Sequence, residues 1–267
     1  MIPDLGTTSS CRLFIAAGKE LVCEDLDQSL GATRRGVREL PQEAQFAAFS
    51  PTCDLLYVAC SNGGIGRRGN QHGLSVVRIQ DPDDLKIEGS IALPHRPIHV
   101  AMDRAGNRLH VAFNLPAAYM AVMLNGDGSI GQAERYSEDA AVVGTFPHQV
   151  LPLPEGDEVI LTCRGDDPTG GEPEHPGSLR ILRPNPLGKM ECIQAVAPGS
   201  GFGFGPRNCA FHPSLPVLYA VLERQNAFAM FGRSGRELAE KPAALLSTLL
   251  PDGPAPVAQL AGDLCVH

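Results

Sequence analysis

Four ionisable side chains stand at the ends of extended apolar segments, where a folded sheet could gather them. His148 and Arg207 are each the second residue of a separate apolar segment. Arg164 and Glu223 each come directly after the end of the next apolar segment along the chain. A guanidinium recognises carboxylate or phosphate through its planar fork and stays charged. A histidine exchanges protons near neutral pH, and a carboxylate can orient either group. These residue types indicate a site that binds an anion and transfers a proton.

An internal repeat supplies the elements that must position these residues. In 203–223, the apolar runs Cys209–Phe211 and Val217–Leu222 flank the turn sequence HPSLP, which predicts two antiparallel strands. Related units start at Ala44, Pro97, Pro147, Pro206 and Ala261, with separations of 53, 50, 59 and 55 residues. Strand–turn–strand units repeated at this length predict the blades of a β-propeller, which usually hold four strands each.

Equivalent positions of these units can be compared directly. The second residue of each unit is Gln45, Ile98, His148, Arg207 or Gly262, and the residue that ends the second strand is Ser61, Asn114, Arg164 or Glu223. Only the units that start at Pro147 and Pro206 carry ionisable groups at both positions. Because the innermost strand of a blade lines the central channel, we expect these ionisable groups to cluster at one mouth of that channel.

Two insertions and a glycine-rich run extend the predicted site. The insertions 62–73 and 165–177 follow second strands, so both should emerge on the same face as Arg207 and Glu223. The run GSGFGFG at 199–205 would let a ligand approach the backbone closely. It lacks the GxGxxG pattern of a dinucleotide site. We predict substrate-binding roles for Arg164, Asn114, Gly203 and Gly205.

Each candidate residue also has a structural interpretation. Arg207 and Glu223 could form an ion pair that holds two strand ends together, and His148 could cap a strand through hydrogen bonds. The insertion 165–177 carries a group of potential metal ligands, namely Asp166, Asp167, Glu172, Glu174 and His175. Their spacing matches no metal-ligand pattern, and no GxSxG nucleophile motif occurs in the chain. We therefore predict no metal and no cofactor.

Composition limits the class of protein. The net charge of -8 over 267 residues argues against binding to nucleic acid or to an anionic membrane. The 29 glycines and 23 prolines suit a turn-rich all-β protein, and no apolar run is long enough to span a bilayer. No signal-peptide pattern begins the chain. Cys60, Cys163 and Cys209 lie in apolar runs without any CxxC pair, which predicts buried thiols and a reducing, cytoplasmic setting.

The repeat predicts one propeller domain over residues 1–267. Its units start near residues 12, 44, 97, 147 and 206, which gives about five blades, and a further first strand is expected from residue 261. Because a blade does not end inside a first strand, we expect a C-terminally incomplete propeller that lacks about two blades. Residues 1–11 are expected to form an arm or an outer strand, and 239–249 an outer strand or a short helix.

One stretch carries a family resemblance. GPRNCAFHPSLPVLYAVLE at 205–223 resembles the GPRH-x-x-FHP…YVxNE signature of the seven-bladed lactonase propeller family, which includes bacterial 6-phosphogluconolactonases and fungal carboxy-cis,cis-muconate cyclases. PHQV at 147–150 resembles a second motif of that family. Asn208 and Leu222 depart from the signature, which has His and Asn there. The resemblance implies a site of His148, Arg207 and Glu223.

The resemblance implies an enzyme that acts on a small anionic lactone of the sugar-acid or muconate type. His148 would activate water, Arg207 would bind the anionic group or stabilise the oxyanion, and Glu223 would orient them. The same trio could instead close the lactone in a cyclisation. The partner expected is a small anionic lactone or carboxylate, with no nucleic acid and no membrane. The alternatives are a non-catalytic propeller that binds an anionic molecule or a protein, and a metal-dependent gluconolactonase-type propeller that a chelator would inactivate.

Overall fold

The computed structural model describes residues 11–64, 66–249 and 260–266. The chain forms two compact units, one of residues 1–97 with 125–130 and the other of residues 98–124 with 131–267. The boundary at Pro97 coincides with the start of a strand and with a predicted unit start. The single propeller domain expected from the repeat remains a prediction.

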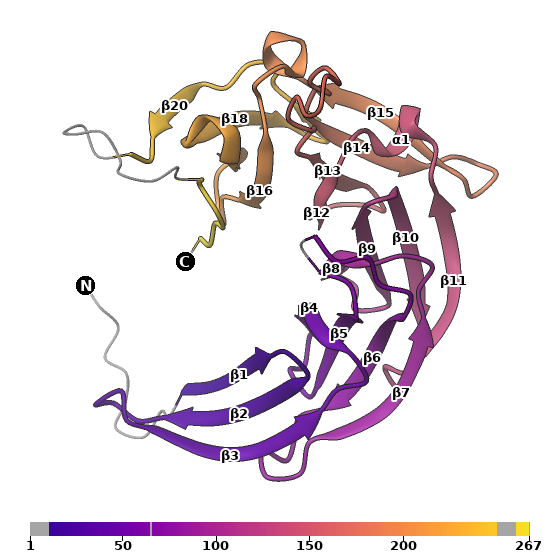
Figure 1. Cartoon of the computed structure of the whole chain (residues 1–267), viewed down its shortest axis with the longest axis vertical. Helices are drawn as coiled ribbons and strands as arrows, with labels where there is room; N and C mark the ends of the chain where they lie inside the picture. The colour runs from indigo at the N-terminus through magenta and orange to yellow at the C-terminus, as the bar shows by residue number, and fades with distance from the viewer. Residues whose placement is uncertain (1–10, 65, 250–259, 267) are drawn as a thin grey trace. The chain divides into compact units, whose positions relative to one another are not determined.

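The first unit holds two antiparallel sheets, each with its strands adjacent in chain order (Figure 1). The strands are β1 (Cys11–Ala17), β2 (Glu20–Leu26), β3 (Ala32–Glu39), and then β4 (Glu43–Phe49), β5 (Leu55–Ser61), β6 (His72–Arg78) and β7 (Lys86–Ala92). One cluster of buried side chains joins the two sheets, with Leu21 and Cys23 on β2 and Leu56 and Val58 on β5. Burial of these apolar faces holds the two sheets together.

The second unit holds three sheets, which follow the same meander order except that β20 of the third sheet pairs with β18. Their strands are β8 (Pro97–Met102), β9 (Arg108–Asn114), β10 (Ala117–Leu124), β11 (Ile130–Ser137), β12 (Pro147–Pro152), β13 (Val159–Cys163), β14 (Ser178–Pro184), β15 (Met190–Val196), β16 (Pro206–Phe211), β17 (Val217–Leu222), β18 (Ala227–Ser234), β19 (Glu237–Leu238) and β20 (Ala244–Ser247). The short helices are α1 (Ala140–Val143), η1 (Pro198–Gly201) and η2 (Glu223–Gln225). Sequential antiparallel strands within one sheet are the topology of a propeller blade.

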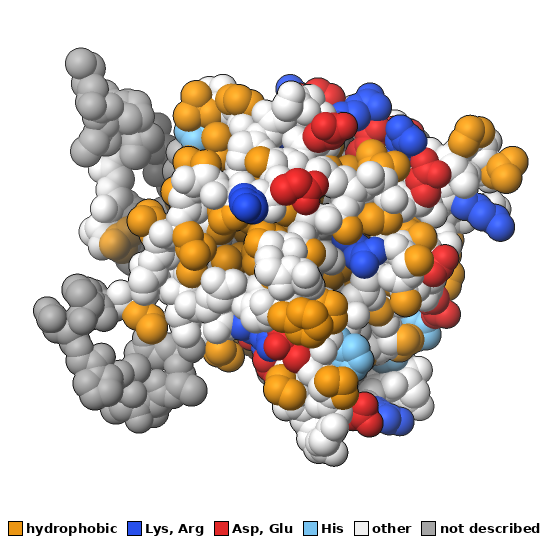
Figure 2. Space-filling model, turned by 90° about the horizontal axis from the view of Figure 1, so that it is seen from above, with side chains coloured by type: hydrophobic (Ala, Val, Ile, Leu, Met, Phe, Trp, Pro, Cys, Tyr) orange, Lys and Arg blue, Asp and Glu red, His pale blue; other side chains and the backbone are white. Residues whose placement is uncertain are grey.

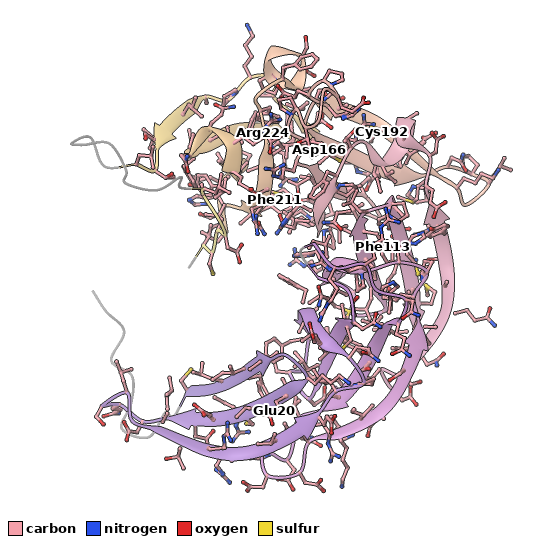
Figure 3. The ribbon with its side chains drawn as sticks, in the orientation of Figure 1. Glu20, Phe113, Asp166, Cys192, Phe211 and Arg224 are labelled. Carbon is pink, nitrogen blue, oxygen red and sulfur yellow. The ribbon has the colours of Figure 1, made fainter. Side chains whose placement is uncertain are left out.

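Strand β13 explains why the middle strands read as continuous apolar runs. All its residues are buried. Val159, Leu161 and Cys163 pack with side chains of β9 and β10, whereas Ile160 packs with side chains of β16, β17 and β18. Because successive side chains point to opposite faces, a strand between two neighbouring sheets must be apolar on both. Phe113 on β9, labelled in Figure 3, is likewise fully buried.

The predicted all-β organisation is confirmed, with one difference. The first strands β4, β8, β12 and β16 begin at or beside the predicted unit starts. The segment 239–249 contributes the outer strand β20, which pairs with β18, rather than a helix. The first strand expected from residue 261 is wrong for the described residues, because 260–266 form no strand and pair with no neighbour there. The arm expected at 1–11 lies outside the described residues, apart from Cys11 in β1.

The predicted burial of the thiols is also confirmed. Cys60, Cys163 and Cys209 are buried and form no disulfide. Burial raises the pKa of the Cys60 thiol to about 11, so this thiol stays protonated at neutral pH. On the face shown in Figure 2, acidic and basic side chains are interspersed rather than gathered by sign. Within the described residues, no helix combines the length and the hydropathy that a bilayer span needs.

Candidate functional site

His148 and Arg207 each occupy a β-bulge at the start of a first strand. The pairing of β12 with β13 shifts register between Pro147 and Gln149, and that of β16 with β17 shifts between Pro206 and Asn208. The residue inside each shift has no partner in the ladder, so the bulge re-aims its side chain. The two residues singled out by the repeat therefore share one backbone geometry.

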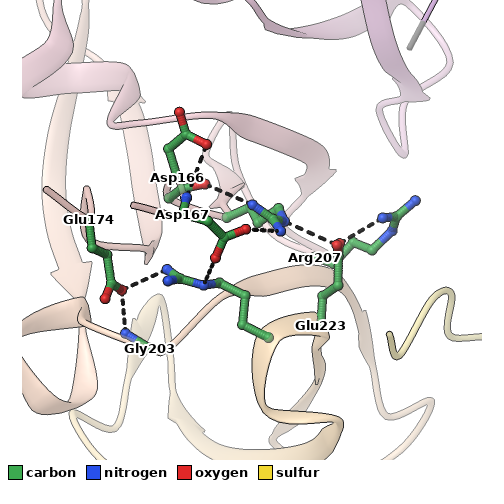
Figure 4. Close-up of polar contacts among 9 residues, drawn as sticks. Asp166, Asp167, Glu174, Gly203, Arg207 and Glu223 are labelled. Carbon is green, nitrogen blue, oxygen red and sulfur yellow. Dashed lines mark hydrogen bonds and ion pairs between the residues drawn. The ribbon is translucent and has the colours of Figure 1, made fainter. Parts of the chain in front are cut away.

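Glu223 is the centre of the site, and it joins two arginines. Its Oε2 accepts a hydrogen bond from Nη1 of Arg207 at 2.6 Å, and its Oε1 accepts one from Nε of Arg164 at 3.1 Å (Figure 4). The side chain of Glu223 is 5% exposed, that of Arg164 12%, and that of Arg207 35%. A buried carboxylate is stable when cations compensate it, and here two guanidiniums do so. Of the two guanidiniums, that of Arg207 is the more accessible to a ligand.

The insertion 165–177 extends this pairing into a chain of alternating charges. Asp167 accepts hydrogen bonds from Nη2 of Arg164 and pairs with Nε of Arg224, both at 2.8 Å. Glu174 pairs with Nη1 of Arg224 at 2.7 Å and accepts the backbone N–H of Gly203 at 2.5 Å (Figure 4). Three arginines thus alternate with three carboxylates. The expectation that this insertion lies on the face of Arg207 and Glu223 is confirmed.

Gly205 allows Glu223 and its neighbour Arg224 to take these places. Its carbonyl accepts the backbone N–H of Glu223 at 2.8 Å. Gly205 has φ of +53°, and a Cβ there would lie 2.4 Å from Cγ of Arg224. A residue with a side chain would be strained at this φ and would displace the arginine. The glycine-rich run therefore accommodates protein side chains, and Gly203 already donates its N–H to Glu174.

His148 is held neutral by its surroundings. Burial first, and then the positive charge of Arg207, lower the pKa of its imidazole to about 4, while Glu223 opposes the shift. Its Nδ1 is buried without a hydrogen-bond partner among the described residues. No hydrogen bond joins it to Glu223 within that part of the chain. The residue as a whole is only partly buried, so a ligand or water can reach the imidazole away from Nδ1. A neutral imidazole can accept a proton there.

The structure brings together Arg164, Arg207 and Glu223 by direct contact, and His148 by electrostatic proximity. It does not link Asn114 to them. Asn114 ends β9 and is buried, with no hydrogen bond to the site in the described residues. Its predicted role, like those of Gly203 and Gly205, remains a prediction.

Sequence reasoning missed Arg224 and assigned Asp167 and Glu174 only to an unfavoured metal site. The signal for Arg224 was its place directly after Glu223. His99 on β8 was also missed as a neighbour of His148. It is buried, and burial followed by the proximity of His148 lowers its pKa to about 3. The described residues contain no group of three or more His, Cys, Asp and Glu side chains arranged to hold a metal.

Comparison with known proteins finds similarity to lactonases both in sequence and in structure. No protein-family model matches the chain. A curated relative is the 6-phosphogluconolactonase of Photorhabdus laumondii subsp. laumondii, which is 22% identical over 187 residues covering 69% of this chain and 50% of the relative. The chain therefore spans about half the length of the curated relative it matches.

Solved structures resemble the chain over more of its length. The periplasmic gluconolactonase PpgL of Pseudomonas aeruginosa superposes with a TM-score of 0.70 at 16% identity, over 92% of this chain and 70% of that protein. A candidate 6-phosphogluconolactonase of Bacteroides uniformis gives a TM-score of 0.69 at 16% identity, over 89% of this chain and 68% of that protein. At these identities the likeness establishes the fold.

Proposed function

We propose that the chain hydrolyses a small anionic lactone at the site of His148, Arg207 and Glu223, because its fold is like that of lactonase-type β-propellers. One observation supports this most strongly. An accessible arginine, oriented by a buried carboxylate, lies near a neutral and partly exposed histidine whose pKa responds to its charge. This combination offers an anion site and a proton acceptor side by side.

Arg207 is suited to binding the anionic group of the substrate. Its Nη1 is held by Glu223, and its Nε and Nη2 have no hydrogen-bond partner within the described residues. A guanidinium fixed at one nitrogen can still donate two hydrogen bonds to a carboxylate or phosphate. The Glu223 contact also limits the rotamers of Arg207, so less entropy is lost when the ligand binds.

His148 would serve as the general base and then as the general acid. The imidazole takes a proton from water as the water oxygen attacks the lactone carbonyl carbon, and the carbonyl oxygen becomes an oxyanion. When the ring C–O bond breaks, the imidazolium returns that proton to the departing ring oxygen. The product is an open-chain hydroxy acid, and the histidine is neutral again. Arg207 would stabilise the oxyanion or bind the anionic substituent.

A bound anion would also improve His148 as a base. With a pKa of about 4, the free imidazole holds a proton only weakly. The nearby charge of Arg207 contributes to this low pKa. A substrate anion paired with Arg207 offsets that charge, which raises the pKa of His148 towards neutrality and makes proton transfer more favourable. Binding and base strength are then coupled, which favours anionic lactones over neutral ones.

The test is a lactone hydrolysis assay by pH-stat, with the spontaneous rate subtracted. The substrates are 6-phosphogluconolactone, its neutral counterpart glucono-δ-lactone, and a muconolactone. We expect His148→Gln to lower kcat by about 10²–10⁴-fold. Arg207→Gln should lower kcat/KM for the phosphorylated lactone more than for the neutral one. Arg183→Gln, which removes an exposed ion pair with Glu191 in the same unit, is the matched control.

Two outcomes would contradict the proposal. One is a wild-type rate no greater than the spontaneous rate while the anionic lactone still binds, which would favour a non-catalytic anion-binding propeller. The other is unchanged turnover in His148→Gln, which would remove the general base. The cyclisation alternative is tested with an open-chain muconate, in which a carboxylate oxygen adds to a double bond and the adjacent carbon takes up a proton to give the muconolactone.

A further inference from the structure

The first unit carries a separate basic cluster with an unbalanced arginine. Arg96 lies between β7 and β8, and its Nε donates to Oε1 of Gln45 at 2.8 Å. Its side chain is partly buried. Within residues 11–64 and 66–249 it pairs with no carboxylate, and its Nη1 and Nη2 have no hydrogen-bond partner. A partly buried guanidinium without a counter-charge is costly unless an anion supplies one.

Neighbouring groups increase the positive charge there. Burial and then the charge of Arg67 lower the pKa of Arg96. Glu43 contacts Nη2 of Arg67 at 2.5 Å, so this carboxylate is already paired. Burial, His95 and Arg96 in turn lower the pKa of the His72 imidazole. Burial is the larger cause of both shifts, and in each case a neighbouring basic group adds to it. Arg96 is therefore a partly buried cation close to another cation, which is a setting that favours a bound anion.

The cluster is fixed before any ligand arrives. Gln45 occupies a β-bulge, because the pairing of β4 with β5 shifts register between Ala44 and Phe46. His72 is held through Nδ1 by Oγ of Ser61 at 2.8 Å, and Ser61 is fully buried. The amide of Gln45 directs the guanidinium of Arg96 through a single hydrogen bond, which leaves the terminal nitrogens able to donate. Such preorganisation lowers the entropy cost of binding.

We infer that Arg96, with Arg67 beside it, binds the oxyanion group of a small molecule, a phosphate or a carboxylate, at a site on the first unit. The two terminal nitrogens of Arg96 form a fork that matches either group. The bound anion supplies a counter-charge to Arg96, which pairs with no carboxylate of residues 11–64 and 66–249. This site uses no residue of the hydrolytic site, so the inference stands apart from the proposed function.

The test is isothermal titration calorimetry of the full chain with inorganic phosphate and, separately, with succinate. We expect Arg96→Gln to weaken binding of the preferred anion by at least about tenfold. Arg78→Gln, which removes an exposed arginine of the same unit paired with Glu88, should leave binding unchanged. Tighter binding of phosphate or of succinate identifies which oxyanion the site takes.

A second variant keeps the test decisive if Arg96→Gln does not fold. Gln45→Glu retains an oxygen acceptor for Nε of Arg96 and places a carboxylate beside the guanidinium, so it should abolish binding of the anion in a folded protein. Binding that persists in both variants would overturn the inference. So would binding that is lost in Arg207→Gln and kept in Arg96→Gln, because the anion would then occupy the hydrolytic site.

Discussion

The substitution Glu223→Gln tests whether the charge network holds the site in place. The carboxylate is 5% exposed and accepts from both Arg207 and Arg164, whereas an amide has one oxygen and turns an N–H group towards one of the two donors. A hydrogen bond to a charged group contributes about 1.5–3 kcal/mol. The bond to Arg164 is buried and counts fully, but Arg207 is 35% exposed and regains water, so its bond counts for under about 1 kcal/mol. We expect the free energy of unfolding to fall by about 2–3 kcal/mol.

Urea unfolding followed by circular dichroism measures this change. Glu191→Gln is the control, because Glu191 is 41% exposed and makes one ion pair, with Arg183 at 2.8 Å. It should shift the free energy of unfolding by no more than about 0.5 kcal/mol. A second reading comes from NMR titration of His148, whose pKa should fall below its value of about 4, because Glu223 raises it in the wild type. If Glu223→Gln is as stable as the control and leaves that pKa unchanged, then the carboxylate does not organise the site.

Three further predictions follow from the same geometry. Gly205→Ala should destabilise the fold by about 2–4 kcal/mol in urea unfolding, because its Cβ would meet Arg224; Gly188→Ala, at φ +76° with nothing within 4 Å, should cost only about 1 kcal/mol. Arginine hydrogen bonds lower the pKa of Asp167, so the stability it contributes is present above the ordinary Asp pKa and is lost as pH falls through the lowered value. Amide exchange of its loop, corrected for the intrinsic rate, should therefore rise in acid, and an unchanged rate would refute this. For lactone hydrolysis, kcat/KM should fall as pH drops through about 4, where His148 gains a proton, and kcat should fall at a higher pH; equal apparent pKa values would show that substrate binding does not raise the pKa of His148.

The fold was predictable because a repeated sheet is encoded locally. Each middle strand carries a run of apolar residues, as in Val159–Cys163, and each pair of strands is joined by a short turn. These signals act over a few residues, and the repeat shows the same pattern several times along the sequence. The prediction of a strand from residue 261 was wrong because a local pattern is not sufficient to form a strand. An apolar run forms a strand only where a neighbouring strand satisfies its backbone, and residues 260–266 have no such partner in the described chain.

The grouping of the candidate residues was predictable only where it depends on the repeat. His148 and Arg207 occupy the second position of their units, and Glu223 ends a second strand. The other units, except that of Arg164, carry uncharged residues at these positions, so the difference can be seen in the sequence. The pairing of Arg164 with Asp167 was not predictable in this way. Asp167 lies in an insertion without a counterpart in the unit of Pro206, and its contact with Arg224 spans distant parts of the sequence. Loop side chains find such partners through tertiary geometry, which residue spacing does not record.

The bulges explain how one scaffold can hold different chemistry at equivalent points. Three first strands shift register at the same place, and the residue inside the shift is Gln45 in β4, His148 in β12 and Arg207 in β16. An amide, an imidazole and a guanidinium all occupy this backbone, so the bulge does not depend on the side chain it presents. His148→Gln places in β12 the residue type that β4 already carries at its bulge. A loss of hydrolysis in that variant would therefore report the missing imidazole and not a disturbed strand.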